Sequence, residues 1–270
     1  MSPRIACLCP VIVGPAVNLL QNSLACFQSQ TYPADLRRLY VLDDLRQLQA
    51  EWTENLIVRT CQRSISLPHK YHQLIDLDDG WADAFAVWDH DDIYLPDHLE
   101  AAAESMDLAA NLYGDYATWC HPEHFYSTHP GNMVLVEPAA GRMHGAAIVR
   151  REALATVSGW LGVVPHDRPR VANFDQRLLA ALAHSCTLVR PCADRPTYVY
   201  RWATISHDHC SGLMRNPDDE TWYANHLQRI LERGPLPRFG PLAAQPDAET
   251  SALLRLWYAG ALPSATDARP

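Results

Sequence analysis

The chain has 270 residues, and 48% of them are hydrophobic, which is enough for one sizeable core. A formal net charge of -9 argues against a duplex-binding protein, whose binding face is usually basic. The eight cysteines form no C-x-x-C pair, which is typical of reduced core thiols in a cytoplasmic protein. We find no signal-peptide pattern and no run of about 18 apolar residues, so the sequence predicts no membrane span.

Short apolar runs alternate with helical periods in the first half of the chain. Residues 4–13 predict a buried strand, and apolar residues then recur at helical spacing from Val17 until Pro33 disfavours the helix. Further on we expect strands at 36–44 and 55–60, a helix at 67–83 that ends near Gly80, and a strand at 84–89. This alternation predicts an α/β sandwich around a mostly parallel central sheet.

The second half is less regular. We expect strands within 115–127 and 132–138, a strand followed by a helix from Arg151, and a helix at 174–185. After Gly234 the chain is rich in Pro and Ala, with one amphipathic piece at 251–260. The sequence therefore predicts a main domain over residues 1–233 and a C-terminal extension with a short amphipathic helix over 234–270.

Carboxylates follow two of the predicted strands. Asp43 and Asp44 end one strand, and Asp89, Asp91 and Asp92 follow another. In parallel sheets ligands bind beyond the carboxyl ends of the strands. Three carboxylates at one strand end are costly unless a positive group lies between them. The alternative is that they cap a helix that begins near Pro96, where negative charge is favourable.

Four segments also occur together in a familiar order: the opening strand with Pro10, "FQSQTYP" before "YVLDD", "HKYHQLIDL" and "WDHDDIYLPDHL". This ordered set resembles the family 2 nucleotide-sugar glycosyltransferases, which have the Rossmann-like GT-A fold. Further on, "HGAAIVRREALATVSGW" resembles the segment before the catalytic carboxylate of these enzymes, and "FDQRLLAAL" the helix start that supplies it. "YVYRWATISHDHCSG" resembles a C-terminal segment that often carries a metal-ligating histidine, so the resemblance covers about residues 4–212.

The resemblance implies roles for the matching residues. Asp91 would bind the metal directly, with His209 as the first and His207 as the second choice for a further ligand. Asp175 would be the general base, and Asp92 would orient the loop. Binding of the donor nucleotide and sugar would fall to Pro10, Asp43, Asp44, Lys70, Asp89, His90, His144 and Gly145.

Each role has a plainer alternative. Asp44, or Asp43 in its place, would bind the base of the nucleotide, but both also suit an acidic turn at a strand end. Lys70 would supply positive charge, or it is a solvated helix lysine. Asp175 also suits a helix N-cap, and the two histidines also suit a surface loop. The chain departs from the family pattern where "PVIVGP" replaces P-T-Y-N-R and where Phe174-Asp175 replaces Glu-Asp.

The resemblance implies a metal-dependent, inverting transfer of a sugar from a nucleotide donor, with a UDP-sugar expected, to an acceptor hydroxyl. Mn²⁺ suits mixed carboxylate and imidazole ligands somewhat better than Mg²⁺. A nucleotidyltransferase and a catalytically silent sugar-nucleotide-binding protein are the alternatives. The acceptor stays open among a glycan, a lipid-linked glycan, a protein and a hydroxylated base in modified DNA.

Another cluster is formed by Cys120, His121, His124 and His129, but its spacing fits no compact zinc pattern. The aromatic residues beside it, Trp119, Phe125 and Tyr126, are candidates to line an acceptor cleft instead.

Overall fold

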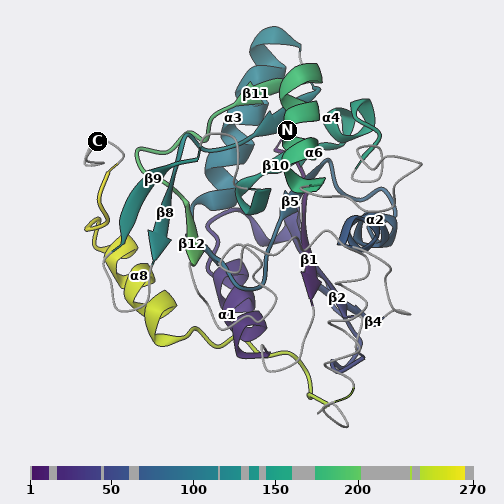
Figure 1. Cartoon of the computed structure of the whole chain (residues 1–270), viewed down its shortest axis with the longest axis vertical. Coiled ribbons are helices and arrows are strands. Elements are labelled where there is room, and N and C mark those ends of the chain that lie inside the picture. The colour runs from purple at the N-terminus through teal and green to yellow at the C-terminus, as the bar shows by residue number, and fades with distance from the viewer. Residues whose placement is uncertain are drawn as a thin grey trace.

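A large twisted sheet forms the centre of the computed structural model (Figure 1). The structure describes residues 2–11, 17–43, 46–60, 67–114, 116–128, 134–139, 144–159, 174–201, 232 and 238–264. The sheet has the strand order β11-β7-β10-β5-β1-β2-β4-β3. Its strands are β1 (Ile5–Val11), β2 (Arg37–Asp43), β3 (Glu51–Trp52), β4 (Leu56–Thr60), β5 (Ala84–Val87), β7 (Thr118–Cys120), β10 (Ile148–Arg150) and β11 (Thr187–Val189).

Most neighbours in this sheet are parallel. Strand β1 pairs in parallel with both β2 and β5, β2 with β4, and β7 with β11. Strand β10 runs antiparallel between β5 and β7, and β3 runs antiparallel at the edge. The carboxyl ends of β1, β2 and β5 therefore meet at one edge of the sheet, where ligands bind in α/β folds.

Helices cover both faces of the sheet because its central strands are apolar on both sides. Along β1, Cys7 and Cys9 face one core with α1 (Val17–Gln28) and α3 (His98–Tyr113), and Leu8 faces the other. The second core is closed by α2 (Leu67–Leu77), α4 (Arg151–Thr156) and α6 (Phe174–Ser185). Continuous burial of β1 is typical of a parallel strand between two helical layers.

A second, smaller sheet packs beside the first. It has the order β6-β12-β8-β9, built from β6 (Ile93–Tyr94), β8 (His124–Thr128), β9 (Leu135–Pro138) and β12 (Tyr198–Arg201). Helix α8 (Ala248–Tyr258) lies next to this sheet (Figure 1) and buries Leu253 in the same core as α1. The predicted α/β sandwich around a mostly parallel sheet is confirmed.

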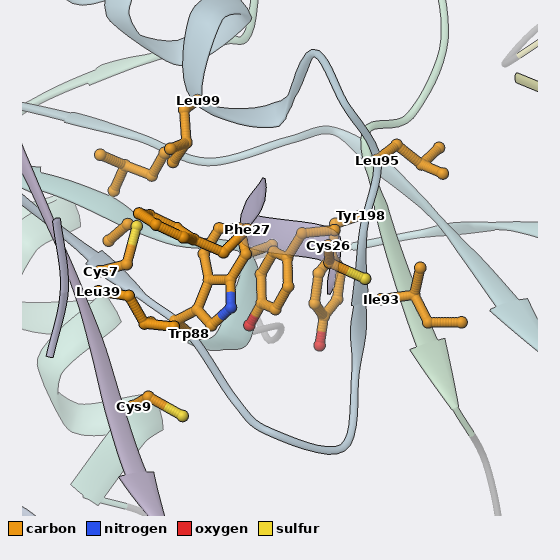
Figure 2. Packing of buried hydrophobic residues seen from close by; sticks show 14 of the residues in the cluster. Cys7, Cys9, Cys26, Phe27, Leu39, Trp88, Ile93, Leu95, Leu99 and Tyr198 are labelled. Carbon is orange, nitrogen blue, oxygen red and sulfur yellow. The ribbon is translucent and has the colours of Figure 1, made fainter. Parts of the chain in front are cut away.

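A cluster of aromatic side chains fills the core that the small sheet shares with α1 and α3. Figure 2 shows Trp88 packed among Phe27, Cys7 and Leu39. The Trp88 ring also stacks on Tyr94 at 3.9 Å between centroids. His98, at the start of α3, lies 5.1 Å from the Tyr94 ring, and its Nδ1 is 2.9 Å from Thr197 Oγ1. Burial lowers the pKa of His98 to about 3, so this imidazole is neutral at pH 7.

We expect acid to destabilise the protein through His98. Because folding lowers its pKa from 6.5 to about 3, the unfolded chain binds more protons between these pH values, and stability falls as the pH falls through this range. His98→Asn should reduce the slope of unfolding free energy against pH by up to about 1.4 kcal/mol per pH unit. Urea unfolding of the wild type and the variant at several pH values between 6.5 and 4.5 measures this slope. An unchanged slope in the variant would contradict a buried neutral imidazole.

Candidate active site at the carboxyl ends of the central strands

The acidic loop, residues 88–94, follows β5 at the carboxyl edge of the large sheet and includes the short strand β6. Asp92 is 2% exposed in this loop. Its Oδ2 accepts a short hydrogen bond from Tyr198 Oη, and its Oδ1 accepts one from the backbone N of Arg201 at 3.2 Å. Both donors belong to β12, so Asp92 fixes the acidic loop to the small sheet. These are the contacts of a residue that orients the loop.

Asp89 is held from several sides. Tyr71 Oη on α2 donates to its Oδ1 at 3.2 Å, and its backbone N donates to Tyr94 Oη at 2.7 Å. A Cβ added to Gly145 would lie 2.8 Å from Asp89 Oδ2 and 2.7 Å from Tyr198 Oη. Gly145, in the 3₁₀ turn η2 (His144–Ala146), therefore brings backbone against the acidic loop where a side chain has no room.

The acids do not cap the following helix. Helix α3 begins at His98, and Asp97 takes the cap position. Asp92 is five residues earlier and is bonded to β12 instead. The capping interpretation of the acidic cluster is therefore wrong.

His90 and Asp91 lie between these anchored acids, at 8% and 7% exposure. The Nε2 atom of His90 is buried without a hydrogen-bond partner among the residues that the structure describes. Burial raises the pKa of the neighbouring Cys9 thiol, and the charges of Asp89 and Asp91 raise it further. Negative charge from both carboxylates thus reaches the carboxyl end of β1, where Lys70 supplies the nearby positive charge.

Lys70 is fully buried, and its Nζ donates to Val11 O at 2.7 Å. The alternative of a solvated helix lysine is wrong, because α2 turns this side chain inward onto the end of β1. Pro10 is buried in the same strand. Asp43 Oδ2 accepts from the backbone N of Gln47 and of Leu48, at 2.6 and 2.8 Å, and so closes the turn that follows β2.

The charge of Asp175 acts on both rings of a buried pair, Tyr71 and His144. Tyr71 and His144 pack edge to face at 5.4 Å. Burial raises the pKa of Tyr71, with the charges of Asp89 and Asp175 adding to it, while burial lowers the pKa of His144 to about 4 against the charge of Asp175. Asp175 is inside the first turn of α6, which packs on η2. The structure thus brings Asp89, His144, Gly145 and Asp175 around Tyr71.

Three predicted site residues, Asp44, His207 and His209, lie outside the described parts of the chain. Within those parts, no three His, Cys, Asp or Glu side chains converge as metal ligands would. The residues proposed to line an acceptor cleft belong to the core, because Trp119, Phe125 and Tyr126 are at most 3% exposed. That interpretation is wrong.

Sequence reasoning missed Tyr71, Tyr198 and Arg201. Tyr71 and Tyr198 lie inside segments that resemble the glycosyltransferases, but aromatic residues in apolar patterns suit a core equally well. Their hydroxyl contacts with Asp89 and Asp92 span 18 and 106 residues, so no local spacing indicates them.

No family model matches the sequence, and no curated protein is significantly similar to it. Solved structures are similar in fold. TarS from S. aureus in complex with UDP-GlcNAc aligns with a TM-score of 0.51 and 15% identity, over 76% of this chain and 60% of that one. The mannosyltransferase PcManGT from Pyrobaculum calidifontis, in complex with GDP-Man and Mn²⁺, aligns with a TM-score of 0.50 and 16% identity, over 97% and 81%.

The chain has the GT-A fold. It spans about 60% of the TarS fragment, residues 1–349, that it matches. In this GT-A fold the acidic loop, Lys70 and Gly145 surround the carboxyl ends of β1 and β5. No helix in the described parts of the chain combines the length and apolar character needed to cross a bilayer.

Gly145→Ala should destabilise the protein. The new methyl group would overlap Tyr198 Oη and Asp89 Oδ2, and relief requires both anchors of the acidic loop to move. We expect a loss of about 1–3 kcal/mol in unfolding free energy, measured by urea denaturation. Gly240→Ala is the matched control, because a Cβ there meets nothing within 4 Å. Equal stability of the two variants would contradict the close approach of η2.

Proposed function

We propose that the protein is a metal-dependent glycosyltransferase that moves a sugar from a nucleotide donor, a UDP-sugar, to an acceptor hydroxyl with inversion. The observation that carries the proposal is the convergence of Asp89, Asp91 and Asp175 around Tyr71 and the end of β1 in a GT-A fold. The UDP-GlcNAc, GDP-Man and Mn²⁺ in the similar structures support this choice of ligand class.

The carboxylate oxygens of Asp89 and Asp91 suit a hard divalent cation. Asp91 would bind the cation, and Asp89 would contact a metal-bound water or the donor ribose. Mn²⁺ and Mg²⁺ both favour such oxygen ligands and keep positions for water and diphosphate oxygens. When bound, the cation neutralises charge on the departing diphosphate. His209, or else His207, stays the predicted further ligand.

Asp175 acts as the general base. It accepts the proton of the acceptor hydroxyl while that oxygen attacks the anomeric carbon, and the nucleoside diphosphate leaves with the electron pair of the broken bond. His144 is neutral because burial lowers its pKa to about 4. A neutral imidazole beside the base contacts sugar hydroxyls without competing as a cation for the diphosphate. Lys70 contributes positive charge from beneath β1.

Asp91→Asn tests the metal role. We expect transfer to be abolished, together with the Mn²⁺ dependence of UDP affinity, because the amide loses the charge that binds the cation. Isothermal titration with UDP, with and without Mn²⁺, and a donor screen that includes GDP-mannose measure this. Asp76→Asn removes an exposed carboxylate from α2 and serves as the control. Wild-type transfer that persists in excess EDTA would contradict the proposal, and release of pyrophosphate in place of UDP would identify a nucleotidyltransferase.

Asp175→Asn tests the base. The amide keeps the shape of the side chain but cannot accept the proton, so turnover should fall by about 10² to 10⁴ with donor affinity nearly unchanged. Glu152→Gln, which removes an acid from the first turn of α4, controls for the loss of charge at a helix start. Retention of most of the turnover by Asp175→Asn would return Asp175 to a structural role.

A further inference from the structure

The C-terminal strap, residues 238–264, crosses the same edge of the sheet as the candidate site. It consists of an extended stretch, helix α8 and a short tail (Figure 1). Leu253 and Leu262 are buried in the main core at 3% and 7% exposure. The strap is therefore packed as part of the domain despite its Pro- and Ala-rich composition.

One end of the strap touches the turn that Asp43 closes. The backbone N of Phe239 donates to Gln47 O at 2.8 Å, and the backbone N of Gln47 donates to Asp43 Oδ2. Further along, the backbone N of Gln245 donates to Gln21 O at 3.0 Å on α1. The strap thus starts at the acidic end of β2 and runs along α1.

The start of α8, in the middle of the strap, reaches the acidic loop through Arg201. The guanidinium of Arg201 has 8% exposure and pairs with Asp247 Oδ2 at 2.7 Å and with Glu249 Oε2 at 3.0 Å. Burial disfavours its charge, but the two carboxylates outweigh burial and raise the pKa of Arg201. The backbone N of the same residue donates to Asp92 Oδ1.

Asp247 is itself fixed by three contacts. Its Oδ1 accepts from the backbone N of Thr250 at 2.8 Å and so caps α8, while its backbone N donates to Asn22 Oδ1 at 3.0 Å. Its Oδ2 is then aimed at Arg201. In the last turn of α8, Trp257 Nε1 donates to Asp97 Oδ1 at 3.0 Å, three residues after the acidic loop. The ion pair reaches Asp92 through Arg201, and the indole contact reaches Asp97 after the loop, while the cap fixes the orientation of Asp247.

We propose that the C-terminal strap is a positioning element of the donor site. In it, Asp247 and Glu249 act through Arg201 to fix Asp92 and, with it, the acidic loop. This inference rests on the proposed function for its ligand, a nucleoside diphosphate with a divalent cation. Residues that hold metal ligands from outside typically change metal affinity about 10- to 100-fold when they are removed. The strap should therefore control metal-linked nucleotide affinity although it supplies no ligand.

The test uses the full chain with Asp247→Asn and Glu249→Gln combined. We expect the Kd for UDP in the presence of Mn²⁺ to rise about 10- to 100-fold, while UDP binding in EDTA is unchanged. Without any ligand, amide hydrogen exchange of residues 89–94 should be faster than in the wild type. If the double variant does not fold, Glu249→Gln alone keeps the α8 cap and should show the same effects at smaller size.

Asp107→Asn is the matched control. It breaks the ion pair of Asp107 with Arg150, whose side chain is likewise 8% exposed, at the far end of β5. This control should lower the melting temperature but leave the Mn²⁺-linked Kd and the exchange of residues 89–94 unchanged. Equal effects of both variants, or no effect of the strap variant, would overturn the strap proposal. Wild-type protein that binds no nucleoside diphosphate with Mn²⁺ would overturn the proposed function instead, and the exchange measurement would still decide whether the strap holds the loop.

Discussion

The buried carboxylate of Asp92 is the constraint on which the site depends. A carboxylate at 2% exposure requires hydrogen-bond donors, and β12 supplies two of them, Tyr198 Oη and the backbone N of Arg201. This fixes the small sheet against the end of β5. It also leaves Arg201 buried, so its side chain in turn requires the acids of α8. Asp92 and Arg201 thus link two distant elements, β12 and α8, to the acidic loop.

Tyrosine hydroxyls separate the like charges of the acidic loop. Tyr71 binds Asp89, and Tyr198 binds Asp92. Burial raises the pKa of both tyrosines, and the neighbouring carboxylates raise it further, so both remain protonated donors at neutral pH. Each of these two carboxylates therefore accepts a hydrogen bond from a neutral tyrosine, Asp89 from α2 and Asp92 from β12. Arginine at these two positions would add positive charge beside the carboxylates, whereas tyrosine adds none.

The sequence predicts the first half of the fold well, because burial there follows a simple period. The run around Cys7 is buried on both faces, and the helices from Val17 and Pro68 have clear apolar stripes. The short strands β6 and β12 have no such signal, since they pair across distant segments. Lys70 shows the same limit at the site. Its burial depends on an acceptor 59 residues away, so the sequence alone does not separate it from a solvated lysine.

Amino-acid composition does not indicate how the C-terminal strap packs on the rest of the chain. Pro and Ala are typical of a linker, but here the extended stretch bonds through backbone N atoms at Phe239, Gln245 and Asp247. Such contacts require no particular side chain within the strap, so they leave no pattern in its sequence. In the sequence, Asp247 and Glu249 are typical of an acidic helix start. Their ion pairs with Arg201 become visible only in the structure. An acidic helix start can therefore serve two sites at once, since the dipole of α8 and a buried guanidinium both favour negative charge at the same position.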